Sequence, residues 1–280
     1  MSTTFTLGFS PCPNDTFIFD ALINGKIDTG DLHFEPFMED VEALNNMALK
    51  GLASITKLSF YTYSKVAHNY QLLDSGAALG VNCGPLLVTS KPMRFEPTEL
   101  AQHIQSMRIA VPGFNTTANA LLSFFYPQAI NKYACLFSDI ENDVLNGNAD
   151  AGLIIHEGRF TYQQKGLHKL VDMGELWEKH THGPLPLGGI AIRRDLPEDV
   201  KKHVNKLVKE SVCYAFAKPD SGKDYIRQHA QEMEESVIRK HIELYVNDYS
   251  IDLGTKGRKA IELFLNLIDP GRNQAASLFL

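Results

Sequence analysis

Residues 5–22, FTLGFSPCPNDTFIFDAL, carry the clearest indication of how this chain folds. The opening residues of this stretch alternate between apolar and polar or small side chains, as a β-strand does, and its second half is typical of a helix. Pro11 and Pro13 interrupt the strand, and Asn14 or Asp15 can cap the helix that follows. The pattern therefore predicts a strand, a tight turn and a helix in direct succession.

The same succession occurs three more times, at residues 53–68, 107–122 and 152–162. Each begins with a β-prone run, passes through a short polar or glycine-containing turn and continues into a helical segment. Repeated alternation of this kind predicts an α/β fold with mostly parallel strands. Further helices are expected near the C-terminus, at residues 197–218, 224–234 and 236–249.

Two similar segments indicate how the chain is divided into domains. Residues 84–89 and 183–192 both place Gly-Pro before an apolar strand, and about one hundred residues with two of the four turns lie between them. We expect a larger discontinuous α/β lobe from residues 1–89 and 190–280, with residues 90–189 inserted as a smaller α/β lobe. Two crossings between lobes form a hinge, so a ligand is expected in a central cleft.

Composition narrows the possible functions. The 280 residues are 44% hydrophobic and 21% charged with a net charge of −6, and no basic stripe is present, so nucleic acid is not an expected partner. No apolar run approaches the roughly 18 to 20 residues of a membrane-spanning helix, and the N-terminus lacks the features of a leader. We expect a cytoplasmic protein that binds small molecules and no membrane. Its four widely spaced cysteines are expected to be reduced thiols, without a structural metal.

The segment GLIIH, residues 152–156, ends an apolar run typical of a buried strand in an imidazole. Ligands of open α/β sheets lie beyond the carboxyl ends of the strands, so His156 is a candidate general base. A packed or surface histidine is the alternative interpretation. Glu157 and Arg159 flank it and could orient the ring, although a surface ion pair would also explain them.

The turns that precede helices are candidate anion sites, because the first backbone N–H groups of a helix and its dipole favour negative ligands. Thr116 and Thr117 can donate hydroxyls there, and Ala118 offers an unobstructed N–H. Simple capping of the helix is the alternative explanation for the threonines.

Lys57, Leu58 and Ser59 place a cation and a hydroxyl at another such turn. Asn14 is either a ligand-binding residue or an N-cap, and Cys12 is interpreted as structural because no base stands at a fixed spacing from it. The pair His180 and His182 could suggest a metal, but no carboxylate accompanies it in the pattern.

Five blocks together resemble one family. They are LGFSPCPNDTFIF at 7–19, EDVE at 39–42, TKLS at 56–59, GLIIHEGRFTY at 152–162 and LPLGG at 185–189. The resemblance is to the 1,4-dihydroxy-6-naphthoate synthases of the futalosine route to menaquinone. It extends from residue 5 to about residue 265 and departs at Gly158, where serine is familiar.

The resemblance implies a fold similar to that of type II periplasmic binding proteins. It also implies a lyase that breaks a carbon–carbon bond of cyclic dehypoxanthine futalosine to release 1,4-dihydroxy-6-naphthoate, without a metal or other cofactor. The family's general base falls on His156. Its substrate-binding segments fall on the residues Lys57, Leu58, Ser59, Thr116, Thr117 and Ala118. From the residues alone, we expect Asn14 to bind the substrate as well.

Two other functions remain open from the sequence. A chorismate dehydratase of the same pathway would have a similar fold, and a small-molecule binding protein would share the two-lobed shape without performing chemistry. The residues also leave open the oligomeric state and whether Lys57 or Glu157 assists His156.

Overall fold

The computed structural model describes residues 3–230, 234–272 and 277–280. The chain divides into two compact units, which we call unit 1 (Met1–Gly80 with Pro186–Leu280) and unit 2 (Val81–Leu185). The limits expected from the sequence, 89/90 and 189/190, lie four to nine residues later than these. They differ because β6 (Leu86–Thr89) pairs with strands of unit 2, whereas β11 (Leu185–Arg193) pairs with strands of unit 1.

The sheet of unit 1 is mixed. Its strands are β1 (Thr3–Phe9), β2 (Leu32–Met38), β3 (Ile55–Ser59), β4 (Tyr70–Leu72), β5 (Ala78–Gly80) and β11. Their order is β2-β1-β3-β11-β4, and β5 pairs with β11 beside this path. The strands β2, β1 and β3 are parallel, as their succession with helices predicts, whereas β11 runs antiparallel to β3 and β4.

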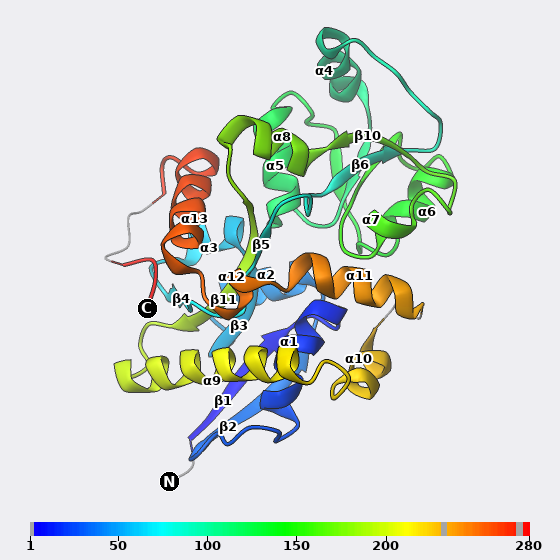
Figure 1. Cartoon of the computed structure of the whole chain (residues 1–280). Coiled ribbons are helices and arrows are strands. Elements are labelled where there is room, and N and C mark those ends of the chain that lie inside the picture. The colour runs from blue at the N-terminus through cyan, green and yellow to red at the C-terminus, as the bar shows by residue number, and fades with distance from the viewer. Residues whose placement is uncertain (1–2, 231–233, 273–276) are drawn as a thin grey trace. The chain divides into compact units, whose positions relative to one another are not determined.

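Eight helices accompany this sheet within the described residues. They are α1 (Pro13–Ile23), α2 (Val41–Leu49), α3 (Phe60–Val66), α9 (Glu198–Ala217), α10 (Lys223–His229), α11 (Glu235–Tyr245), α12 (Asp248–Ile251) and α13 (Gly254–Ile268). All residues of α1 except Ile23 are buried, because α1 packs against the sheet core and against α9, α10 and α11 (Figure 1). The elements that follow residue 186 therefore enclose the first helix of the chain.

The helix expected at residues 236–249 is two helices. Helix α11 ends at Tyr245 and α12 begins at Asp248, because Asn247 forms a capping box with Ser250 between them. The helix expected at 224–234 corresponds to α10, and residues 231–233 of that expectation lie outside the described part of the chain.

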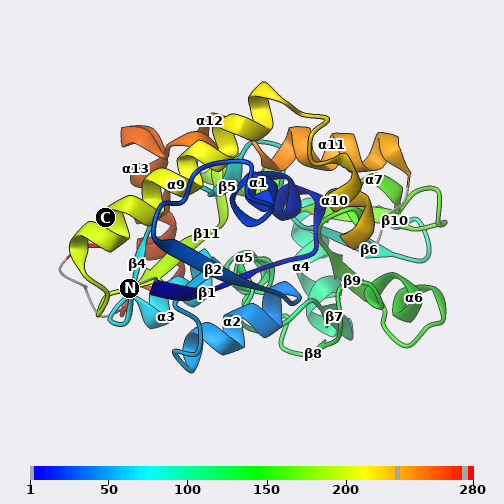
Figure 2. The ribbon, with the colours of Figure 1, turned by 90° about the horizontal axis from the view of Figure 1, so that it is seen from below.

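Unit 2 has a second sheet, in the order β10-β6-β9-β7-β8. Its remaining strands are β7 (Ile109–Val111), β8 (Lys132–Ala134), β9 (Ala151–Ile154) and β10 (His168–Asp172), and its helices are α4 (Pro97–Ser106), α5 (Thr117–Phe125), α6 (Ile140–Leu145), α7 (Gly158–Thr161) and α8 (Met173–Thr181). Strands β9, β7 and β8 are parallel and follow one another across the sheet (Figure 2). Strand β6 is antiparallel to β9 and β10.

Close packing in unit 2 depends on glycines. A Cβ on Gly152 of β9 would lie 2.5 Å from a methyl of Ile140, so the absence of a side chain allows α6 to lie directly on the strand. A Cβ on Gly84 would lie 2.2 Å from the backbone nitrogen of Gly174, where β6 and α8 meet. The Gly-Pro start of β6 is thus a site of close backbone approach.

None of the described helices is both long enough and apolar enough to cross a lipid bilayer.

Candidate functional site

The turn between β1 and α1 is built around a buried carboxylate. Cys12 is the N-cap of α1 but makes no capping hydrogen bond with its side chain, and Pro13 occupies the first helical turn. Asp15, in the same turn, instead reaches back to Ser10, whose backbone N–H and hydroxyl both donate to Asp15 Oδ2 at 3.1 and 2.7 Å. The carboxylate is 1% exposed and lies where the helix dipole favours negative charge.

Lys57, on β3, makes an ion pair with this carboxylate. Its Nζ lies 2.8 Å from Asp15 Oδ1 and also donates to the carbonyl of Gly76 at 3.2 Å. Asn14 Nδ2 donates to the same Oδ1 at 2.9 Å. A buried ion pair is tolerated only when its remaining hydrogen-bonding groups are satisfied, and here Asp15 accepts four hydrogen bonds. The structure therefore brings Asn14 and Lys57 together around Asp15, a residue that the sequence suggested only as a cap.

Ser59 stands at the end of β3 and is the N-cap of α3, yet its hydroxyl makes no capping hydrogen bond. Asn45 holds it instead, accepting from Ser59 N at 2.9 Å and donating to Ser59 Oγ at 3.1 Å. Within the described residues the Ser59 hydroxyl donates to no protein acceptor, so its hydrogen is available to a ligand.

The side chain of Leu58 is fully buried in unit 1. Its carbonyl faces β11, where a Cβ on Gly188 would lie only 2.7 Å from the oxygen. The predicted contact of Leu58 with a ligand is therefore restricted to its backbone.

His156 lies just beyond the carboxyl end of β9, in the left-handed region at φ 54°. Such a conformation is uncommon for a residue other than glycine, and strain of this kind often accompanies functional sites. The ring is half-buried and meets the ring of Phe137 edge to face, with centroids 5.0 Å apart. Glu157, the next residue, is buried and forms the N-cap of the short helix α7.

Arg159 is not a partner of His156 in these contacts. Its guanidinium donates to Asp172 Oδ2 at 2.7 Å and to the carbonyl of Gly84 at 2.6 Å. Asp172 also caps α8, so this arginine fastens α7 to β6 and α8. Arg159 thus makes a partly buried ion pair within unit 2, not the surface ion pair that was the alternative from the sequence.

The turn before α5 contains the three other predicted residues. Thr116 Oγ1 accepts from Asn119 N at 3.2 Å and donates to the carbonyl of Gly113 at 2.8 Å, so its hydroxyl is used to cap the helix. The Ala118 N–H has no acceptor among the described residues, as expected in the first turn of a helix. Thr117 and Ala118 are both buried. This turn thus offers a backbone donor, with Thr116 as its support.

Sequence reasoning missed Asn119 in the same helix. Its side-chain amide donates to the carbonyl of Phe114 at 3.0 Å, and its buried Oδ1 has no hydrogen-bond partner in the described part of the chain. Its position three residues after the N-cap Thr116 was the available signal.

His180 and His182 lie at the end of α8, where each has a contact or conformation that belongs to the fold of unit 2. His182 ends α8 in the left-handed conformation, and the ring of His180 packs against Phe124 and Phe125 at centroid distances of 5.5 and 6.1 Å.

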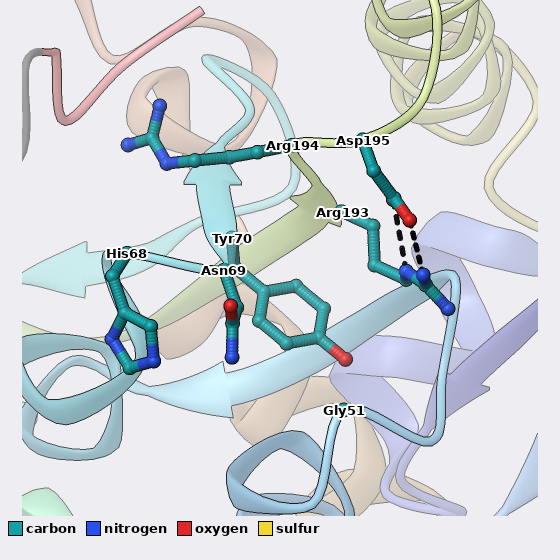
Figure 3. Close-up of a pocket in the computed structure, with 7 residues that line it drawn as sticks. All are labelled: Gly51, His68, Asn69, Tyr70, Arg193, Arg194 and Asp195. Carbon is teal, nitrogen blue, oxygen red and sulfur yellow. Dashed lines mark hydrogen bonds and ion pairs between the residues drawn. The ribbon is translucent and has the colours of Figure 1, made fainter.

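Unit 1 also has a surface pocket of about 280 Å³, drawn in Figure 3. Its lining residues are Gly51, His68, Asn69, Tyr70, Arg193, Arg194 and Asp195. Arg193 is paired with Asp195, and Arg194 donates to the carbonyl of Ala67. The pocket lies near the amino end of β3, whereas Ser59 lies at the carboxyl end, where ligands of such sheets bind. None of the predicted site residues lines it.

Comparison with known proteins finds one family over almost the whole chain. The model of the family described as menaquinone biosynthesis matches residues 5–269. A 1,4-dihydroxy-6-naphthoate synthase of Thermus thermophilus is 46% identical over 91% of this chain and 90% of its own length. A second protein of that name, from Streptomyces coelicolor, is 39% identical over 92% of this chain and 90% of its own length.

Solved structures agree on the architecture. A crystal structure of an Archaeoglobus fulgidus protein is 31% identical, with a TM-score of 0.87 over 95% of this chain and 97% of that one. A Candida albicans protein described as having the generic periplasmic binding protein fold is 14% identical, with a TM-score of 0.67 over 98% and 92% of the two chains. The fold of the present chain is accordingly α/β and like that of periplasmic binding proteins.

Proposed function

Because this chain belongs to the menaquinone biosynthesis family and is related to 1,4-dihydroxy-6-naphthoate synthases over 91% of its length, we propose that it is a carbon–carbon lyase that converts cyclic dehypoxanthine futalosine to 1,4-dihydroxy-6-naphthoate. The observation that carries the proposal is His156, a strained histidine just beyond the end of a parallel strand in a chain with this family match. A cytoplasmic location and a reaction without metal or cofactor remain part of this proposal.

In the proposed reaction, His156 is the general base. Its neutral imidazole accepts the proton of a sugar hydroxyl, and the resulting alkoxide becomes a carbonyl as the adjacent carbon–carbon bond breaks. The electron pair of that bond passes into the fused ring and ends on the ring carbonyl oxygen, which takes up a proton and becomes a phenolic hydroxyl. The gain of aromatic character favours cleavage, and the imidazolium can return the proton that it accepted.

The other predicted residues act as substrate contacts. Lys57 uses two of its three N–H groups on Asp15 and Gly76, which leaves one donor and a fixed positive charge for a carboxylate of the substrate. The Ser59 hydroxyl, the Ala118 N–H and Thr117 can stabilise that carboxylate or a developing oxyanion. Asn14 is held beside Lys57, and Leu58 contributes its backbone.

Two of the predicted residues have supporting functions in addition. Thr116 acts mainly through the cap that holds the turn before α5 in place. Lys57 is held by Asp15, so we assign it to binding and leave proton abstraction to His156.

The test is to incubate the purified protein with cyclic dehypoxanthine futalosine, without added metal or nucleotide, and to follow dihydroxynaphthoate by mass spectrometry. His156→Ala is expected to lower turnover by at least about 10²- to 10⁴-fold, as typical for loss of a general base. His168→Ala, an exposed histidine on β10, is the matched control and should behave as wild type.

Each alternative predicts a different result. Turnover that persists in His156→Ala would show that another group is the base. Binding without turnover by the wild-type protein would indicate a binding protein, and dehydration of chorismate in a parallel assay would indicate a chorismate dehydratase.

A further inference from the structure

A completely buried histidine of unit 1 touches the predicted substrate-binding residue Asn14. His241 lies on α11, is 0% exposed, and its Nε2 is 2.8 Å from Asn14 Oδ1. Its ring packs on that of Tyr245, one turn later on the same helix, with centroids 4.7 Å apart. A buried imidazole in this position needs a reason, since it is far from His156 in the sequence and has no part in the reaction described above.

The hydrogen bonds determine which atom carries the proton. Asp15 Oδ1 can only accept, so the group of Asn14 that lies 2.9 Å from it must be the amide NH₂. The Asn14 oxygen then faces His241 and needs a donor there. His241 Nε2 must therefore be protonated, and the hydrogen bond runs from His241 to Asn14.

A continuous buried chain of hydrogen bonds follows from this assignment. It runs from His241 Nε2 to Asn14, from Asn14 to Asp15 Oδ1, and is joined there by Lys57 Nζ at 2.8 Å. No member is more than 7% exposed. At low effective dielectric such bonds strengthen one another, and loss of one partner leaves the next group unsatisfied.

We propose that His241 is a positioning residue, which holds the Asn14 amide and, through Asp15, the Lys57 ammonium in the orientation that binds the substrate. This inference rests on the proposed function in that Asn14 and Lys57 are taken as substrate contacts. It adds a residue of α11 to a site whose other members in unit 1 come from β3 and the start of α1.

The test compares two substitutions at the same position. His241→Leu fills the space without a donor, whereas the amide nitrogen of His241→Gln can reach the place of Nε2. We expect His241→Leu to lower kcat/KM about 10- to 100-fold, mainly through KM, because the groups affected are binding groups. For His241→Gln, kcat/KM should lie within a few-fold of the wild-type value.

The variant Ile238→Ala is the control for a general loss of packing in α11. Ile238 lies three residues earlier on α11, is buried among apolar side chains, and makes no bond to the polar chain. Ile238→Ala should lower the melting temperature of the protein without changing KM for the substrate. If His241→Leu and Ile238→Ala alter KM alike, or if His241→Leu leaves KM at the wild-type value, His241 is not a positioning residue.

A second measurement distinguishes failure of this inference from failure of the proposed function. Absence of turnover in the wild-type protein would contradict the lyase assignment. Calorimetric binding of 1,4-dihydroxy-6-naphthoate to the same variants would then decide the role of His241. Weaker binding in His241→Leu that Gln restores would support the role, and equal binding in every variant, or no binding by any of them, would overturn it.

Discussion

At the scale of single residues, Asp15 holds two of the four predicted binding residues of unit 1, Asn14 and Lys57. It is buried with a full set of four hydrogen bonds, one of them from the Lys57 ammonium. Such an arrangement adds little stability relative to apolar residues of similar size. Removal of one charged partner, however, leaves the other charge buried and uncompensated.

Lys57→Met should therefore destabilise the protein by roughly 3–5 kcal/mol, measured by urea denaturation. The double variant Lys57→Met with Asp15→Asn should regain part of that loss, because no charge remains buried. Lys169→Met, which removes a partner from the exposed pair with Glu175, is the control and should change little. Equal losses in the two single lysine variants would contradict this account of Asp15.

Thiol chemistry gives a second residue-scale prediction. Burial raises the pKa of the Cys83 thiol to about 12, so almost no thiolate forms there near neutral pH, whereas Cys213 is exposed. With Ellman's reagent, Cys213 should react in the folded protein and Cys83 only after unfolding. The fast phase should disappear in Cys213→Ser; its persistence would show that another thiol is accessible.

The residue-scale site could be predicted only in part from the sequence. His156 follows the apolar run 152–155, and the sequence pattern places Lys57 at a strand-to-helix junction, so local pattern and resemblance both make them candidates. The contact between His241 and Asn14 joins positions 227 residues apart, and no local pattern connects them. Hydrogen-bond assignments such as these depend on tertiary packing.

At the scale of elements, the ends of helices follow sequence signals closely where capping chemistry is strong. Pro13 marks the start of α1, Thr116 caps α5 and Asn247 caps α12. The sequence predicted one helix over residues 236–249 and did not show this last cap, because Asn247 lies inside an otherwise continuous helical pattern. A capping side chain can thus divide a helix that periodicity alone would extend.

Helix α7 provides a prediction at this scale. Glu141 Oε1 is buried and has no hydrogen-bond partner among the residues that the structure describes, and a Cβ on Gly158 would lie 3.1 Å from it. Gly158→Ser should stabilise the protein by about 1 kcal/mol, since the hydroxyl can donate to that oxygen and glycine disfavours a helix. Gly158→Ala lacks the hydroxyl donor, so its gain in stability should be smaller. Thermal unfolding of the wild-type protein and the two variants measures both gains. An equal gain for alanine would show that the carboxylate is not the cause.

At the scale of the whole molecule, surface carboxylates make stability depend on pH. A side-chain hydrogen bond is the main cause that lowers the pKa of five carboxyl groups. They are, with the partner in parentheses, Asp143 (Asn148), Asp195 (Arg193), Glu198 (Lys201), Glu235 (Lys223) and Asp252 (Lys209). Because each folded pKa lies below the unfolded one, the stabilisation is complete above about pH 4 to 5 and is lost as pH falls through the folded value.

Asp252→Asn tests this relation. Urea denaturation should find the variant less stable than wild type near pH 7, and the difference should shrink as the pH falls below about 4. A difference that stays constant over this range would mean that the Lys209–Asp252 pair does not contribute through its charge.

The α/β class of the molecule could be predicted from the fourfold succession of strand, turn and helix. The edges of the two units could not be placed exactly where the structure has them, because the Gly-Pro pattern marks where a strand begins and not which sheet it joins. Only pairing reveals that β6 belongs with β9 and β10.

The position of β11 has a consequence for synthesis of the protein. Unit 1 is completed only when this strand takes its place between β3 and β4, and it is translated after all of unit 2. The first 80 residues therefore remain without β11 until more than one hundred further residues have been synthesised. Unit 2, in contrast, leaves the ribosome as one continuous segment. Pulse-labelling hydrogen exchange on stalled nascent chains should find β7 and β9 protected before β1 and β3. Protection in the opposite order would mean that β1 and β3 pair with other segments before β11 is synthesised.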